Sequence, residues 1–194
     1  MKILGVIFDN RLSFKSHIDS ICTKVRNRIN MISKLRHYLP QKVVNLIYKA
    51  LVIPILDYSI CVYGFTYSTH LERIVKLQRR AAHIITQSNA DSMSLFESLG
   101  WKPFINRRNY FASICIYKSL NKLSANLCHK IFKYKSSDYK TRSIHNSEVH
   151  LPSSELECFR NSIFYSGVQI FNNISLEIRN NSFNTFVTKL KNCF

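Results

Sequence analysis

Acidic residues are the first side chains to consider for catalysis, because enzymes that use two metal ions need carboxylates that converge. The chain has eleven acidic residues, which are scattered and form no Asp-Asp or Asp-x-Asp pair. Glu155 and Glu157 lie two residues apart, so a helix would place them on different faces. We interpret these two as part of a solvated polar segment. The sequence therefore predicts no catalytic carboxylate.

Asp57 differs from the other acids because it lies in an apolar stretch. Burial of a carboxylate is costly unless a cation pairs with it. We therefore expect Asp57 to pair with an Arg or Lys from a neighbouring helix, in a structural rather than a catalytic role.

Histidine and cysteine offer little sign of a metal site. The only suggestive grouping is Cys128, His129, His145 and His150, and it lacks the close cysteine pair that zinc sites use. The six cysteines are typical of reduced, mostly buried thiols in an intracellular protein. The four glycines lie far apart and form no phosphate-binding loop. We expect no metal or other cofactor in this chain.

Charge points instead to binding. Lys and Arg outnumber Asp and Glu by 28 to 11, which gives a formal net charge of +17 and a pI near 9.8. Such an excess indicates an anionic partner, with nucleic acid as the first candidate and an acidic membrane surface as the second. A charge excess that only keeps the protein soluble is the plain alternative.

The basic residues gather in three sequence clusters. They are Lys24, Arg26, Arg28, Lys34 and Arg36; then Arg73, Lys76, Arg79 and Arg80; then Arg107 and Arg108, with Lys118 beyond them. Cations on rigid helices suit phosphate contacts that carry no base specificity. Five aromatic residues either stack on bases or pack between helices: Tyr38, Tyr48, Tyr58, Tyr63 and Trp101.

These clusters lie on predicted helices, because apolar residues recur there at spacings of three and four. The first helix spans 16–39 and has an apolar stripe formed by Ile18, Ile21, Cys22, Val25, Ile29, Ile32, Leu35 and Leu39. A second apolar segment, 43–65, resembles a membrane span, but its charges and Pro54 favour a soluble helix that kinks or breaks at the proline. Two capping boxes, at Thr69/Glu72 and Ser94/Glu97, predict the starts of the next helices.

The two ends of the chain have their own patterns. At the start, Ile3–Phe8 predicts one strand, followed by a turn at 9–11 and a return at 12–14. Towards the end, 133–160 is polar and predicts a linker. Gly167 suggests a close helix contact, and Ser182 the cap of a final amphipathic helix.

The predicted fold is mainly α: a helical bundle with an N-terminal β-hairpin and a small C-terminal helical unit. We expect five segments, with boundaries at 1–14, 15–88, 89–132, 133–160 and 161–194. A two-stranded hairpin is marginal alone. The first segment is therefore expected either to fray or to pack on the helices near Ile18 and Cys22.

Several strings, taken in order, resemble the reverse transcriptases of non-LTR retrotransposons of the jockey type. They are KILGVIFDNRLSFKSHI at 2–18, LIYKALVIPILDYSICVYG at 46–64, LERIVKLQRRAAHIIT at 71–86, LGWKPFINRRNYFASICIYKSLN at 99–121, and a tail with YSG, FNNISLEIRN and SFNTFVTKLKNCF. The chain departs from the pattern at 122–132 and lacks a terminal Cys-His knuckle.

The resemblance implies that 2–14 corresponds to the last palm hairpin and 15–88 to the helical thumb that grips the template–primer duplex. Residues 89–194 would be the C-terminal extension. The family's catalytic tyrosine-x-Asp-Asp motif and the magnesium site of its palm have no counterpart here. No catalytic residue is therefore carried over, and this chain by itself is expected to be inactive as a polymerase.

Two functions remain as hypotheses. In the first, the chain is a fragment of an RNA-directed DNA polymerase that binds RNA or an RNA–DNA duplex through its basic helices. In the second, it is a domesticated or incidental helical module that binds protein or an acidic membrane surface, as its basic amphipathic first helix suggests. The first hypothesis expects no membrane and no small-molecule substrate. The compartment stays open between nucleus and cytoplasm.

Overall fold

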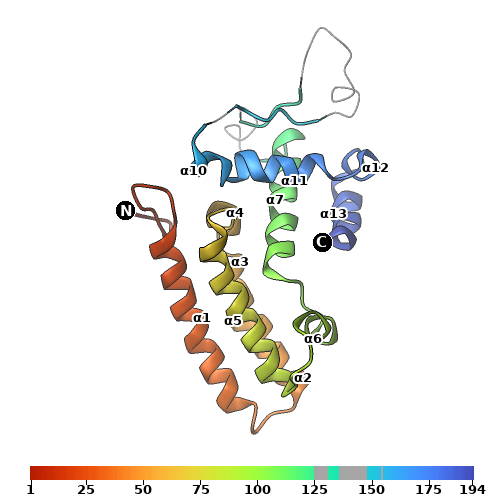
Figure 1. The fold of residues 1–194 in the computed structure, drawn as a ribbon. Coiled ribbons are helices and arrows are strands. Elements are labelled where there is room, and N and C mark those ends of the chain that lie inside the picture. The colour runs from red at the N-terminus through yellow and green to blue at the C-terminus, as the bar shows by residue number, and fades with distance from the viewer. Residues whose placement is uncertain (125–130, 136–147, 154) are drawn as a thin grey trace. The chain divides into compact units, whose positions relative to one another are not determined.

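A computed structural model describes residues 1–124, 131–135, 148–153 and 155–194, and it is mainly helical, as the sequence predicts (Figure 1). The chain divides into two compact units, Met1–Arg107 and Arg108–Phe194. This division is coarser than the five expected segments, and its boundary falls inside helix α7.

The first unit begins with a hairpin and continues with helices. Its elements are β1 (Lys2–Ile3), β2 (Val6–Ile7), α1 (Lys15–Leu35), α2 (Gln41–Leu51), α3 (Ile53–Asp57), α4 (Ile60–Tyr63), α5 (Ser68–Thr86), α6 (Ser92–Leu99) and the start of α7 (Phe104–Leu120). In Figure 1, α1 and α5 run side by side through this unit, and the two helices are in contact. No helix in the described ranges is long and apolar enough to cross a membrane.

The N-terminal prediction was wrong in detail. Ile3–Phe8 is not one strand but a whole antiparallel hairpin, in which Ile3 pairs with Val6. Leu4 and Gly5 form its turn, and both have positive φ (45° and 85°), the conformation that two-residue hairpin turns require. Gly5 makes this turn possible, and the apolar run alone did not reveal it.

The turn at 9–11 is confirmed, but 12–14 is not a returning strand. Leu12 donates its N–H to the Asp9 carbonyl, and the Asp9 carboxylate accepts from the N–H groups of Arg11 and Ser13. Leu12 and Phe14 both have a φ of 52°, which is incompatible with an extended strand. The segment instead turns the chain into α1.

The hairpin packs on α1 and does not stand alone. Val6 is buried, and Ile7 donates its N–H to Nδ1 of His17 in the first turn of α1 (3.4 Å). The ring of Tyr63 packs edge-on against the His17 ring. Of the two expectations, fraying and packing on the helices, the structure shows packing, and His17 is a contact of the hairpin on α1.

The stripe predicted for the first helix is confirmed for α1. Its buried side chains include the first six of the predicted apolar residues, Ile18, Ile21, Cys22, Val25, Ile29 and Ile32. Leu35 and Leu39 are half-buried, and α1 ends at Leu35, four residues before the predicted end at Leu39. Burial raises the pKa of the Cys22 thiol, which suits an inert core position.

The apolar segment 43–65 breaks into three short helices, as Pro54 predicts. Pro54 lies in the first turn of α3, where its missing N–H is tolerated. Ser59 then adopts a φ of 56° and starts α4. The segment thereby folds back on itself within the first unit.

Both predicted capping boxes were wrong. Helix α5 begins at Ser68 after Tyr67, without a side-chain cap. For α6 the cap is Asp91, whose carboxylate accepts from the N–H of Met93 (3.0 Å). The helix therefore starts one turn earlier than the predicted box, at an aspartate three residues upstream of Ser94. Gly100 ends α6 with a φ of 63°.

Aromatic packing joins α2 to the segment after α6. The Trp101 ring stacks on the Tyr48 ring at a centroid distance of 3.9 Å, and its Nε1–H donates to Asn45 Oδ1 (2.7 Å). Tyr48, Tyr63 and Trp101 are buried, so they are packing residues rather than base-stacking ones. Tyr38 and Tyr58 are exposed.

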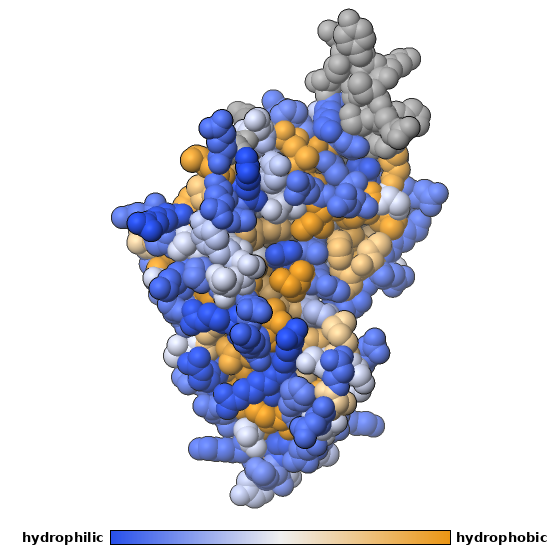
Figure 2. Space-filling model, viewed as in Figure 1, coloured by the Kyte–Doolittle hydropathy of each residue, from blue (hydrophilic) through white to orange (hydrophobic). Residues whose placement is uncertain are grey.

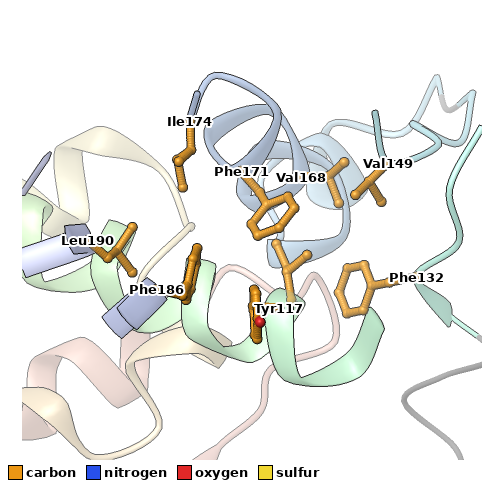
Figure 3. Close-up of a cluster of buried hydrophobic side chains, with 9 residues drawn as sticks. Tyr117, Phe132, Val149, Val168, Phe171, Ile174, Phe186 and Leu190 are labelled. Atoms are coloured by element: carbon orange, nitrogen blue, oxygen red, sulfur yellow. The ribbon is translucent and has the colours of Figure 1, made fainter. Parts of the chain in front are cut away.

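The second unit is built around the remainder of α7. It adds α10 (Glu157–Arg160), the π-helical turn η1 (Ile163–Gly167), α11 (Val168–Asn172), α12 (Leu176–Arg179) and α13 (Phe183–Cys193), and an antiparallel bridge joins Tyr134 to Val149. Figure 3 shows its core, in which Tyr117 and Phe186 stack at 4.2 Å between ring centroids. The other core members are Ile116, Phe132, Val149, Val168, Phe171, Ile174 and Leu190.

The linker prediction needs a correction at its C-terminal side. Val149 lies within 133–160 yet is fully buried, and Asn172 hydrogen-bonds both its N–H and its C=O. This part of the segment belongs to the core of the second unit. Ser182 precedes α13 as predicted, but its side chain makes no capping bond to the backbone. Cys128, His129 and His145 lie outside the described residues.

We predict that the hairpin–α1 contact weakens in acid. Nε2 of His17 is buried without a hydrogen-bond partner among the described residues, and burial, with the nearby charge of Lys24, lowers the His17 pKa. As pH falls below about 6.5, the unfolded chain binds a proton that the folded chain resists. The stability contribution of neutral His17 is therefore full above that pH and decreases below it.

The measurement is the free energy of unfolding of the wild type and of His17→Gln at pH 7.5 and at pH 5. The wild type should lose more stability on acidification than the variant, which keeps the other six histidines as background. Equal losses would show that His17 does not titrate differently in the two states.

Gly167 generates a second prediction. A Cβ built there would lie 2.8 Å from Cγ1 of Ile163 and 3.5 Å from Cδ1 of Ile116, inside the core of the second unit. Gly167→Ala should therefore destabilise the protein by about 1–3 kcal/mol through overpacking. Urea unfolding followed by circular dichroism measures this, with Gln169→Ala, an exposed change on α11, as the matched control. Similar stabilities for the two variants would contradict the close contact.

Candidate nucleic-acid interface

Helices α1 and α5 pack in parallel, which decides where their basic residues lie. Near the N-terminal ends, Arg73 of α5 donates to the Asp19 carboxylate of α1 (2.5 Å). Near the C-terminal ends, Arg36 donates to the carbonyl of Ile85 (2.7 Å). Two contacts with nearly the same sequence offset, 54 and 49 residues, fix both the direction and the register.

One face of α5 gathers three of the predicted residues. Arg73, Lys76 and Arg80 follow the spacing i, i+3 and i+7, so they share one side of the helix. Arg73 marks that side as the one next to α1, because it reaches Asp19. Lys76 and Arg80 are exposed, and the hydrogen bond from Arg73 to Asp19 raises the pKa of Arg73, which stays charged.

Arg26 and Lys34 extend this surface onto α1. Arg26 lies seven residues, or about two turns, beyond Asp19 on the same side of the helix. Since Arg80 lies seven residues beyond Arg73, Arg26 and Arg80 approach the same stretch of surface from the two helices. Asn30 lies about one turn beyond Arg26 on this side, and Lys34 lies one further turn beyond Asn30. Both Arg26 and Lys34 are exposed.

We call Arg26, Lys34, Arg73, Lys76 and Arg80 the basic seam. In Figure 2, viewed as in Figure 1, hydrophilic side chains cover most of the surface over α1 and α5, with smaller hydrophobic patches between them. Among the described residues, the acids that form ion pairs with the seam are Asp19 and Glu72, and Glu72 forms an exposed pair with Lys76 (3.8 Å). An exposed pair of this kind is weak, so it leaves Lys76 available to a phosphate.

The other predicted residues of α1 do not join the seam. Lys24 and Arg28 lie on another side of α1. Lys24 is close enough to His17 to help lower its pKa. Arg36 is held inside the unit by its bonds to the Ile85 and Leu39 carbonyls. The five basic residues of the first sequence cluster, 24–36, therefore do not lie on one face. A helix turns by about 100° per residue, so nearness in sequence does not put side chains on the same side.

Arg79 also faces away from the seam. It lines a cavity of about 310 Å³ together with Val75, Asp91, Met93, Phe96 and Phe104. This cavity lies on the α6 side of α5. The neighbours Arg79 and Arg80 thus serve different surfaces, although the sequence grouped them in one cluster.

The two arginines of α7 are engaged within the protein. Arg107 forms a two-pronged ion pair with Asp57, in which Nε donates to Oδ1 at 2.9 Å and Nη2 donates to Oδ2. This is the cationic partner from a neighbouring helix that the sequence predicts for Asp57, so the structural expectation for that residue is confirmed. Arg108 donates to the side chain of Asn109, and burial lowers its pKa.

Of the four residues considered as metal ligands in the sequence, only His150 lies within the described residues. No cluster of three potential metal ligands occurs in the ranges that the structure covers. The seam consists of five cations, and the two acids beside it, Asp19 and Glu72, are paired with them, so it offers hydrogen-bond donors rather than ligands for a cation. Chemically, this arrangement suits an extended polyanion.

Comparison with curated proteins finds polymerases of mobile elements. The chain is 42% identical over 82 residues to the RNA-directed DNA polymerase from mobile element jockey of Drosophila funebris, which is 41% of this chain and 9% of that protein. It is 31% identical over 90 residues to the probable RNA-directed DNA polymerase from transposon X-element of Drosophila melanogaster, which is 44% of this chain and 10% of that protein. The jockey polymerase of Drosophila melanogaster gives 32% over 90 residues, with the same shares.

The chain thus spans about a tenth of the length of the curated relatives that it matches. No family model matches, and no solved structure gives a significant match. The predicted resemblance to jockey-type reverse transcriptases is confirmed by these relatives.

We predict that Asp57 and Arg107 are coupled in stability. Both side chains are about one-fifth exposed, so removing one partner leaves the other charge largely desolvated. Asp57→Ala, Arg107→Ala and the double variant form a cycle, which should give a coupling of about 1–3 kcal/mol in the free energy of unfolding. A coupling near zero would show that the pair does not hold α3 to α7.

Proposed function

We propose that this chain serves the RNA-directed DNA polymerase of a non-LTR mobile element by holding a nucleic-acid backbone along the basic seam. The curated relatives, which are named as RNA-directed DNA polymerases, support the polymerase context. The observation that carries the binding proposal is that two parallel, packed helices present Arg26, Lys76 and Arg80 on one surface.

The mechanism is contact between cations and phosphates. Rigid helices fix the positions from which the Arg and Lys side chains extend. Binding therefore needs to order only those side chains. Each neutralised phosphate releases condensed counterions, which makes the affinity strongly dependent on salt. Cations on the surface of rigid helices suit contacts with phosphates, and the recognition proposed here is therefore of backbone and shape. An RNA duplex or an RNA–DNA duplex is the expected ligand.

The seam makes a quantitative prediction. Arg26→Gln together with Arg80→Gln should weaken binding to a short RNA–DNA duplex, and the slope of log affinity against log salt should become less negative by about 0.9 for each phosphate that the variant no longer neutralises. Fluorescence anisotropy over a range of potassium chloride concentrations measures both quantities. Lys42→Gln with Lys49→Gln is the matched control, since it removes the same charge from exposed positions on α2.

The control should shift affinity slightly and leave the salt slope unchanged. If both double variants change the slope equally, binding follows net charge and the seam is not a site. Anionic vesicles at the same salt test the alternative function, a module for acidic membranes. Tighter binding to vesicles than to the duplex would favour that alternative.

A further inference from the structure

Three phenylalanine rings of the second unit form one wall of an open cavity. The Phe132 and Phe164 rings lie 5.8 Å apart between centroids at an interplanar angle of 29°. The Phe164 and Phe159 rings lie 6.3 Å apart at 17°. The cavity has a volume of about 260 Å³, and its other lining residues are Ile131, His150 and Pro152. We call it the phenylalanine pocket.

Separate segments supply these rings. Phe132 precedes the bridge between Tyr134 and Val149, Phe159 lies in α10, and Phe164 lies in η1. Phe132 is 7% exposed and belongs to the core, whereas Phe164 is 37% exposed. Phe164 contacts both of the other rings and still keeps more than a third of its surface exposed. Core packing alone does not require that exposure.

Flat, accessible aromatic faces are the groups on which nucleic-acid bases stack, whatever their sequence. Two exposed cations, Lys133 and Arg160, are the chain neighbours of Phe132 and Phe159, and His150 lines the cavity itself. Glu155 and Glu157 are also exposed and precede Phe159. The local charge is therefore nearly balanced, and stacking rather than phosphate attraction has to supply the affinity.

We propose that the phenylalanine pocket stacks an unpaired base of a single-stranded nucleic acid. The proposal rests on the proposed function only for the choice of nucleic acid as ligand, since the pocket shares no residue with the basic seam. Bases in a duplex are already stacked on one another, so they do not enter the pocket. The second unit would thereby add contact with a single strand to the duplex binding proposed for the first.

The test uses the full chain and two probes of equal length and charge: a twelve-residue oligouridine RNA and a ribose-phosphate oligomer that lacks bases. Phe164→Ala and Phe164→Leu remove the aromatic face, and Phe164→Leu keeps most of the apolar volume. Each should weaken binding of the RNA by roughly fivefold or more, the effect typical of removing the stacking of one base. Phe164→Tyr should bind within twofold of the wild type.

Binding of the baseless oligomer should be the same for all these proteins. Leu123→Ala is the matched control, because it removes an exposed apolar side chain of the second unit outside the pocket. Circular dichroism confirms that each variant is folded, and if Phe164→Ala is not, Phe164→Leu and Phe164→Tyr decide the outcome.

Wild-type affinity retained by Phe164→Leu would overturn the proposal, and so would equal binding of the two probes by the wild type. Duplex binding separates this outcome from the proposed function. The Phe164 variants should bind the RNA–DNA duplex as the wild type does, whereas Arg26→Gln with Arg80→Gln should weaken duplex binding. A failed pocket with a salt-sensitive seam therefore leaves the proposed function intact, and the reverse result leaves the pocket intact.

Discussion

The parallel packing of α1 against α5 is the constraint from which the rest of the first unit follows. Two neighbouring helices that run in the same direction cannot be joined by a tight turn, so the chain must travel back along their length. Helices α2, α3 and α4 make that return, and the breaks at Pro54 and Ser59 bend it to fit. The Arg73–Asp19 and Arg36–Ile85 contacts then hold the two long helices in register.

The same constraint sorts the basic residues. Because α1 and α5 each bury one stripe against the unit, their cations are left at different angles around the helix axis. The cations beside the line where α1 and α5 meet form the basic seam. The cations on the other sides of the two helices point to other surfaces of the unit. Arg36 and Arg107 are engaged by internal bonds, although nothing in their side chains distinguishes them from the exposed arginines. A net charge of +17 therefore overstates what any one surface offers.

The sequence predicted what depends on local pattern. The stripe of α1 from Ile18 to Ile32, the break at Pro54 and the pairing of Asp57 all follow from periodicity or from the cost of burying a charge. The spacing of Arg73, Lys76 and Arg80 was also available as a signal for one face. What the sequence could not supply was the angle at which α5 meets α1, because that depends on contacts 49 to 54 residues apart.

The errors have a common physical origin in turns and helix starts, where several residues compete for the same role. Asp91 caps α6 in place of Ser94, and Gly5 turns a run that reads as one strand. The three rings of the phenylalanine pocket escaped sequence reasoning for another reason, since Phe132 is separated from Phe159 and Phe164 by a polar segment.

The stacked pair of Trp101 and Tyr48 has an optical consequence. Trp101 is the single tryptophan of the chain, and its indole is buried and hydrogen-bonded within the first unit. Tyrosines, by contrast, are divided evenly, with five in each unit. Light absorbed selectively by the indole therefore reports the surroundings of α2 and α6, whereas light absorbed by tyrosine reports both units. The chain carries its own internal probe for following one half of the molecule without any label.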